Sequence, residues 1–310
     1  MLQFLSSSKA FMDNFFLIAF TFSLGYILQK FKVFSPDMPL TLNRFVIYIS
    51  LPALILLEIP KLTFSMEMFI PPFIAWIVMI VSALLVLVFS RLMKFSKKVE
   101  GSLMLVSVLT NSSFVGIPMI TAYLGGDSLA YLMMYDQLGT AIALGTYGTF
   151  VVVYYGHSGK IVPSQMLKKV LIFPPFMALV LAFAFIGKSY PSMIENTLHA
   201  LASTVIPLAL VAAGLQLKLF LPKDEIKPFA VSIGIKLIVA PIIAIIISAI
   251  FGWDNMASKV SIMEAGMAPM ITAGAVASMA GLAPRLSSAI VGYGIIFSFG
   301  SSAVLYYFIN

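Results

Sequence analysis

The pentapeptide Pro-Met-Ile-Thr-Ala occurs twice, at residues 118–122 and 269–273, each time inside a long apolar run. The first copy stands in NSSFVGIPMITAYLGG (111–126) and the second in MEAGMAPMITAGAVAS (263–278). Proline removes a backbone donor from a helix interior and glycine weakens the helix, so both runs are expected to be interrupted helices. Because five matching residues can arise by chance in a biased composition, the repetition needs support from the rest of the chain.

The composition is that of a membrane protein. Of 310 residues, 61% are hydrophobic and 10% are charged, with a mean hydropathy of +1.04. A soluble domain carries about 25% charged residues, so this chain is expected to be an all-α polytopic membrane protein in contact with the lipid bilayer. The net charge of +7 is expected in cytoplasmic loops and does not predict a nucleic-acid partner.

Enzymatic chemistry is not expected from this sequence. It contains no cysteine, which excludes disulfides and thiolate chemistry. It also has no Walker glycine loop, no HExxH motif and no dinucleotide or Ser/His/Asp signature in a plausible context. The chain is therefore predicted to be neither an enzyme nor a cofactor-binding protein.

Ten apolar segments are long enough to cross a bilayer, which requires about 20 residues each. They are predicted at 12–30, 39–58, 68–92, 100–124, 128–155, 165–187, 192–217, 227–251, 257–281 and 286–308. The connections are short, so no inserted soluble domain is expected.

The distribution of lysine and arginine predicts the orientation of these segments. The loops on one side are rich in basic residues, as in Lys94, Lys97 and Lys98 after the third segment. The loops on the other side carry only four lysines, namely Lys9, Lys61, Lys188 and Lys259. Because cytoplasmic loops carry the excess of positive charge, both termini are predicted to be extracytoplasmic, which agrees with an even number of spans.

A second pair of prolines indicates an internal repeat. Pro52 in YISLPALILL and Pro207 in TVIPLALVAA lie 155 residues apart, and Pro118 and Pro269 lie 151 apart. We interpret residues 1–156 and 164–310 as two five-helix repeats. Since five is odd, the second repeat enters the membrane from the opposite side, as in many secondary transporters. Simple proline kinks are the alternative interpretation for Pro52 and Pro207.

The fourth and ninth segments are predicted to be broken helices that cross each other. Each has polar residues or glycine close to its proline, and backbone groups freed at a break must find partners inside the protein. The half-helix ends would then present backbone groups to a ligand. The predicted substrate-binding residues are Asn111, Ser112, Ser113, Gly116, Pro118, Lys236, Met267, Ala268 and Pro269.

Three ionisable residues fall well inside predicted spans: Asp136, Lys236 and Glu264. Such groups are costly in lipid and are expected to face the protein interior or a water-filled site. One interpretation is a structural ion pair of Lys236 with Glu264 or Asp136. The other is a cation-coupling site, in which Gln137 and Thr140 of the polar stripe YDQLGTAIALGT accompany Asp136.

Several ordered segments resemble the auxin efflux carrier family, which includes the PIN-type exporters and many compact bacterial permeases. The resemblance covers nearly the whole chain. The segments are LNRFVIYISLPALILLEIP (42–60), NSSFVGIPM (111–119), IPLALVAAGLQL (206–217), IKLIVAPII (235–243) and MEAGMAPM (263–270).

The resemblance implies a fold related to sodium/bile acid symporters, in which helices 1, 2, 6 and 7 form a scaffold and helices 3–5 and 8–10 a mobile core. It also implies a homodimer, an elevator mechanism, carboxylate substrates such as malate, malonate or auxin-like acids, and a bacterial cytoplasmic membrane location. The similarity of Glu264-Ala265-Gly266 and Asn111-Ser112 to the symporters implies a sodium site at Asn111, Ser112 and Glu264, with Gln137 and Thr140 beside it.

These observations predict a secondary active transporter of small organic anions, coupled to sodium or protons. The main alternative is a cation/proton antiporter without an organic substrate, although the paired adjacent aspartates expected of such a protein are replaced by Asp136-Gln137. A non-transporting sensor on a transporter fold is the third class, because fold does not fix function.

Overall fold

The computed structural model describes residues 2–62, 65–156, 164, 168, 171–217, 219, 221 and 223–309, with side chains from Phe16 onward. The described chain is built of helices, six of which are long and apolar enough to cross a membrane. These are Met38–Lys61, Met66–Leu92, Gly126–Gly156, Ser192–Leu215, Lys223–Phe251 and Pro284–Ile309. Shorter apolar helices cover Phe16–Lys30, Ser112–Leu124 and Pro174–Phe183. The chain is thus a polytopic membrane protein.

The chain divides into two compact units. The first comprises Met1–Ser65, Ser113–Met133 and Phe173–Leu217, and the second Met66–Ser112, Met134–Ile172 and Lys218–Asn310. This division by contacts differs from the predicted division into halves 1–156 and 164–310, and each unit draws on both halves.

The first unit is organised around two helix pairs. Helix α1 (Leu2–Lys30) packs along α12 (Val205–Leu215), and α3 (Leu51–Glu58) packs against α10 (Pro174–Phe183) and α11 (Ser192–Ala202). The α1–α12 contact is close because glycines meet there. A Cβ atom on Gly214 would lie 2.9 Å from the Tyr26 nitrogen and 3.0 Å from the Gly25 Cα. The unit also contains α2 (Met38–Phe45) and α6 (Ile117–Leu124), while α7 (Leu129–Met134) ends at the boundary between the units.

Pro52 and Pro207, the two prolines that indicated a repeat, both lie close to a hydrogen bond between their helical segments. The hydroxyl groups of Ser50, two residues before Pro52, and Thr204, three residues before Pro207, are 2.6 Å apart. The segment predicted at 192–217 is interrupted between α11 and α12, where Ser203 and Thr204 form a turn. Proline cannot donate a backbone hydrogen bond, which explains why the helix is interrupted one turn before Pro207.

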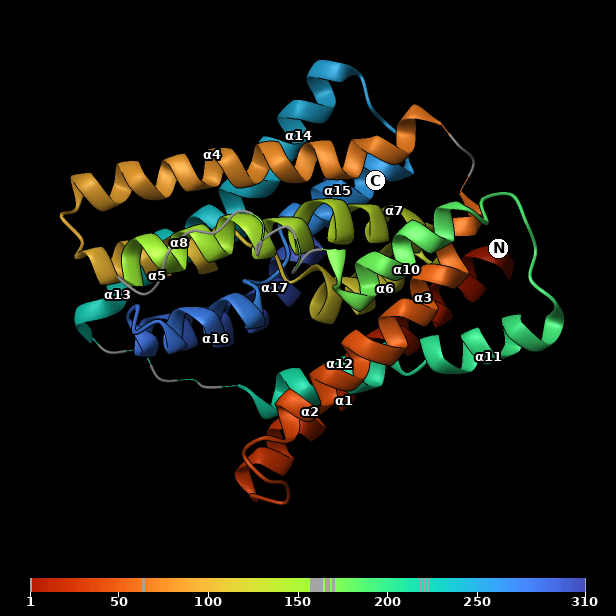
Figure 1. Cartoon of the computed structure of the whole chain (residues 1–310), viewed down its shortest axis with the longest axis horizontal. Helices are drawn as coiled ribbons and strands as arrows, with labels where there is room; N and C mark the ends of the chain where they lie inside the picture. Colours follow the sequence, from red (N-terminus) through yellow and green to blue (C-terminus); the bar gives the residue numbers. More distant parts are fainter. Residues whose placement is uncertain are drawn as a thin grey trace. The chain divides into compact units, whose positions relative to one another are not determined.

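The second unit contains the long uninterrupted helix α4 (Ile70–Leu92), drawn in orange in Figure 1. Helix α4 packs on α14 (Ala240–Phe251) and α15 (Met256–Ala265). Helix α5 (Lys97–Val106) packs on α8 (Thr149–Gly156), α16 (Ile271–Met279) and α17 (Pro284–Ile309). Helix α13 (Ile226–Gly234) precedes α14 in the chain.

Wide, π-helical turns interrupt several of these helices. They cover Val46–Ser50, Ser112–Gly116, Tyr135–Ala141, Leu144–Gly148 and Ile235–Val239. Such turns are rare and often occur at functional sites. Three of the five carry polar residues that the sequence marks as a candidate site: Ser112, Asp136 with Gln137 and Thr140, and Lys236.

Two predicted segments differ from the structure. The run at 165–187 was expected to be one helix, but α10 begins at Pro174 after the extended Phe173. Proline is well suited to a first helical turn, where its missing N–H is not needed, so it starts this helix. The run at 100–124 is interrupted after Val106, well before Pro118, which lies within Ser112–Leu124.

Candidate functional site

The two interrupted runs meet within the second unit. The Asn111 backbone N–H donates to the Ala268 carbonyl at 2.9 Å, and the Met270 N–H donates to the Leu109 carbonyl at 3.1 Å. Thr110 and Pro269 are thereby bridged in an antiparallel manner. Backbone groups freed by one break are therefore satisfied by the other, as a membrane interior requires. On the far side of Pro269, a Cβ atom on Gly294 would lie 2.5 Å from the proline Cδ, so glycine permits α17 to approach the break.

The first polar group of the site is centred on Asp136. Its carboxylate accepts a hydrogen bond from the Ser112 hydroxyl and another, at 2.5 Å, from the Gln137 side-chain amide. All three side chains are buried. A buried carboxylate is stabilised in its charged form by such donors. The structure thus brings together Asp136, Gln137 and Ser112.

The second polar group surrounds Lys236. The Lys236 ammonium donates to the Thr110 hydroxyl at 2.5 Å and to the Ala265 carbonyl at 3.1 Å, and 1% of the residue is exposed. Ala265 is the last residue of α15, and carbonyls in a last helical turn lack an intrahelical partner. These carbonyls also form the negative end of the helix dipole, which favours a cation there.

Glu264 differs from both groups. It is fully buried, and no described residue donates a hydrogen bond to either carboxylate oxygen. The charges of Asp136 and Lys236 act on it, but among the described residues neither lysine nor arginine comes within 4.0 Å to form an ion pair with it. The structural ion pair between Lys236 and Glu264 is therefore not formed. An ionised carboxylate in this position would be disfavoured by several kcal/mol unless a cation or proton joined it.

The other predicted residues divide between the two units. Met267, Ala268 and Pro269 are buried in the break between α15 and α16. Thr140 is buried on the same π-helical turn as Asp136, and its hydroxyl has no hydrogen-bond partner among the described residues.

Ser113, Gly116 and Pro118 belong to the first unit. The break at residues 107–111 precedes Pro118, which lies within the helical segment Ser112–Leu124. The two copies of the pentapeptide are therefore not equivalent: only the second has its proline in the break.

The sequence interpretation missed Thr110 and the Ala265 carbonyl. Thr110 directly precedes the predicted Asn111, so its place in a polar run was the available signal. The carbonyl has no such signal, since every residue carries one and only the end of a helix frees it. Tyr135 was also missed; its side chain is buried on the same π-helical turn as Asp136.

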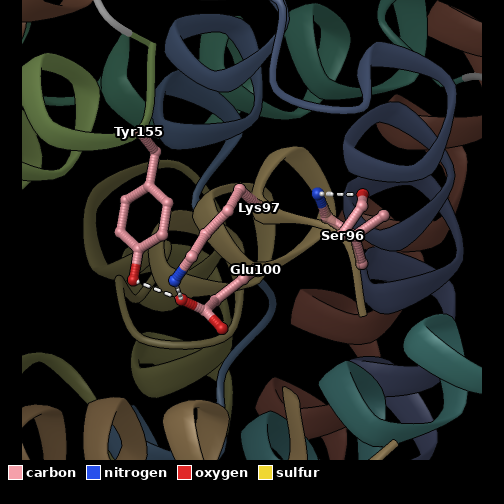
Figure 2. A network of polar contacts seen from close by, with 5 residues as sticks. Ser96, Lys97, Glu100 and Tyr155 are labelled. Carbon is pink, nitrogen blue, oxygen red and sulfur yellow. Dashed lines mark hydrogen bonds and ion pairs between the residues drawn. The ribbon is translucent and has the colours of Figure 1, made fainter. Parts of the chain in front are cut away.

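A separate polar network lies at the start of α5. Figure 2 shows the Tyr155 hydroxyl and the Lys97 ammonium directed at the buried Glu100 carboxylate, at 2.8 Å and 2.9 Å. Ser96 caps the helix by accepting a hydrogen bond from the Val99 N–H at 3.3 Å. The hydrogen bond and the negative charge of Glu100 raise the pKa of the Lys97 ammonium above its ordinary value. This network joins α5 to α8 through the Tyr155–Glu100 hydrogen bond.

Comparisons with known proteins agree with a transport role. The model of the membrane transport protein family matches residues 10–306. An uncharacterized transporter of Methanothermobacter thermautotrophicus is 26% identical over 247 residues, 79% of this chain and 80% of the relative. An uncharacterized transporter of Methanocaldococcus jannaschii is 28% identical over 270 residues, 83% of this chain and 85% of the relative. The chain therefore belongs to the membrane transport protein family, the family of the auxin efflux carriers, and is a multi-pass membrane transporter rather than an enzyme.

Proposed function

We propose that the protein is a secondary active transporter of small organic anions, such as malate, malonate or auxin-like carboxylic acids. The observation that carries this proposal is the pairing of the two helix breaks beside a buried lysine and a buried glutamate that has no hydrogen-bond partner among the described residues. The first N–H groups of α16 follow directly on Pro269, and free N–H groups at a helix start attract anions. These N–H groups offer a place for a carboxylate.

The same cluster supports coupling to a cation. Glu264 requires a positive partner or a proton, and oxygen atoms of Asn111, Ser112, Gln137 and Thr140 are buried in the same unit. We propose that Glu264 and these residues hold the coupling cation, either sodium or a proton. Transporters of this architecture bind such ions at half-helix ends and at backbone carbonyls of unwound helix segments.

We further propose an elevator mechanism on an inverted repeat of ten helices, with helices 4 and 9 crossing at the site and two copies forming a homodimer. The division of the described chain into two compact units supports a moving part and a stationary part. The first unit contains the segments predicted as helices 1, 2 and 7 and, from Phe173 onward, the segment predicted as helix 6. It also takes Ser113–Met133, which the family fold would assign to the core.

The test is flux into proteoliposomes that contain the purified full-length chain. Labelled malate, malonate and an indole carboxylate are offered in parallel under an imposed sodium gradient, an imposed pH gradient or no gradient. We expect at least one acid to accumulate above protein-free liposomes, and unlabelled congeners to compete. If none of the three moves or competes under any gradient, the organic-anion proposal fails.

A cation/proton antiporter is the second candidate, because Asp136, Lys236 and Glu264 are all buried in the same unit. The same vesicles distinguish it when they are loaded with a pH-sensitive dye. Sodium-dependent proton movement in the absence of any organic anion would favour the antiporter, whereas proton movement that requires the anion would favour the proposed symport or exchange.

A further inference from the structure

The ligands of the Lys236 ammonium are those that a small monovalent cation takes. One is the hydroxyl oxygen of Thr110 at 2.5 Å and the other is the Ala265 carbonyl oxygen at 3.1 Å. Small metal cations prefer such oxygen ligands, and transporters bind Na⁺ at carbonyls freed by the end of a half-helix. In this protein the Lys236 side chain, from the π-helical turn Ile235–Val239, places its ammonium between these two oxygen atoms.

The net charge of the buried groups around Glu264 indicates a role for the Lys236 ammonium. The titratable groups that act on it or respond to it are Asp136 and Tyr135, from one π-helical turn, and Lys236, from another. With both carboxyl groups ionised, Asp136, Glu264 and Lys236 together carry one negative charge, since the tyrosine is neutral. One mobile cation or proton neutralises the cluster. Without the lysine, two would be needed.

We propose that Lys236 is a tethered substitute for a mobile cation, and that its ammonium fills a monovalent-cation position between Thr110 and Ala265. This inference rests on the proposed cation-coupled transport, and it adds that one of the cations at the site is the Lys236 ammonium itself. Removal of the ammonium therefore opens a second site, at which a free alkali cation binds.

Thermal stability of the purified, detergent-solubilised full-length chain tests this site without any transport assay. The variants are Lys236→Ala and the neutral, longer Lys236→Gln. The matched control is Lys227→Ala, which removes an exposed lysine from the adjoining helix α13. Each protein is melted in sodium, potassium or choline chloride at one ionic strength.

We expect Lys236→Ala to melt several degrees higher in sodium or potassium chloride than in choline chloride, with a saturable dependence on concentration, because a cation that binds the folded state raises its stability. The difference between alkali and choline salts should be larger than in the wild type and in Lys227→Ala. A second substitution, Thr110→Val, should abolish the gain because it removes one ligand.

Folded Lys236→Ala and Lys236→Gln that respond to alkali salts no more than the wild type would overturn the proposal. So would an alkali response that survives Thr110→Val. Failure to recover either variant folded in sodium, potassium or ammonium salts would also overturn it, since a free cation is expected to replace the lost charge. None of these outcomes depends on the organic substrate, so a negative flux experiment leaves this test intact.

Discussion

The Glu264 carboxyl group is the least compensated charge-bearing group of the candidate site. Its neighbour Asp136 accepts hydrogen bonds from Ser112 and Gln137, and Lys236 donates two, whereas no described residue donates to Glu264. Two carboxyl groups in one cluster thus have different environments. Glu264, which has no donor among the described residues, is the group that we propose to gain and lose a proton or a cation.

Substitution of Glu264 by Gln tests that role at the level of one residue. The amide keeps the shape and removes the charge, so the melting temperature is expected to stay equal or rise, because a buried charge no longer needs neutralising. Ion-driven uptake in proteoliposomes is expected to fall by about tenfold or more.

Glu67→Gln, which changes an exposed carboxyl group in the same unit, is the control and should keep wild-type uptake. A Glu264→Gln protein that retains the wild-type rate and the wild-type ion dependence would show that Glu264 is structural.

Close helix contact is the main feature at the level of elements. Gly25 and Gly214 let α1 and α12 approach until a Cβ atom on Gly214 would meet backbone atoms. Apolar surface gains little from burial when lipid is the solvent, so close packing of small residues has to hold such helices together. The hydrogen bond between Ser50 and Thr204 adds a polar contact within the same unit.

Gly214→Ala is expected to destabilise the protein by about 1–3 kcal/mol, because the added methyl group forces α1 and α12 apart. Chemical unfolding in mixed micelles measures the effect. Gly234→Ala is the matched control, since a Cβ atom there meets nothing within 4 Å; it should be neutral or slightly stabilising. Equal stability of both variants would contradict the importance of the α1–α12 contact.

Sequence patterns predicted the elements better than their irregularities. Long apolar runs were sufficient to predict a polytopic membrane protein, of whose described helices six are long and apolar enough to cross a membrane, and Pro269 marked the second break. Pro118 was misleading because the first break, at residues 107–111, lies upstream of it. The π-helical turns that carry Asp136 and Lys236 have no residue signature of their own, since one extra residue in a turn is stabilised by packing around it.

At the scale of the whole molecule, the candidate site combines side chains that are distant in sequence. Residue type was enough to mark Asp136, Lys236 and Glu264, because ionisable residues are rare in apolar segments. It did not predict their partners. Which carbonyl or hydroxyl lies beside Lys236 depends on where α15 ends and on the pairing of residues 109–111 with residues 268–270.

Membrane orientation is a prediction for the whole molecule. Both termini and Lys188 are expected outside the cell, and the basic loop that contains Lys98 is expected in the cytoplasm. The chain has no cysteine, so single-cysteine variants give an unambiguous signal.

Lys188→Cys should react with a membrane-impermeant maleimide in intact cells, and Lys98→Cys only after the membrane is opened. Both lysines are exposed, so accessibility is matched. The reverse pattern would invert the predicted topology.

The antiparallel pairing of residues 109–111 with residues 268–270 has a consequence for biosynthesis. At typical translation rates, about 10–30 s separate the synthesis of the two paired segments. During this interval the Asn111 N–H and the Leu109 carbonyl lack the partners that they have in the finished protein. A nascent chain therefore carries unsatisfied backbone groups into the bilayer until its last third arrives. Chains that stop before Ala268 are expected to be recognised and degraded by membrane quality control.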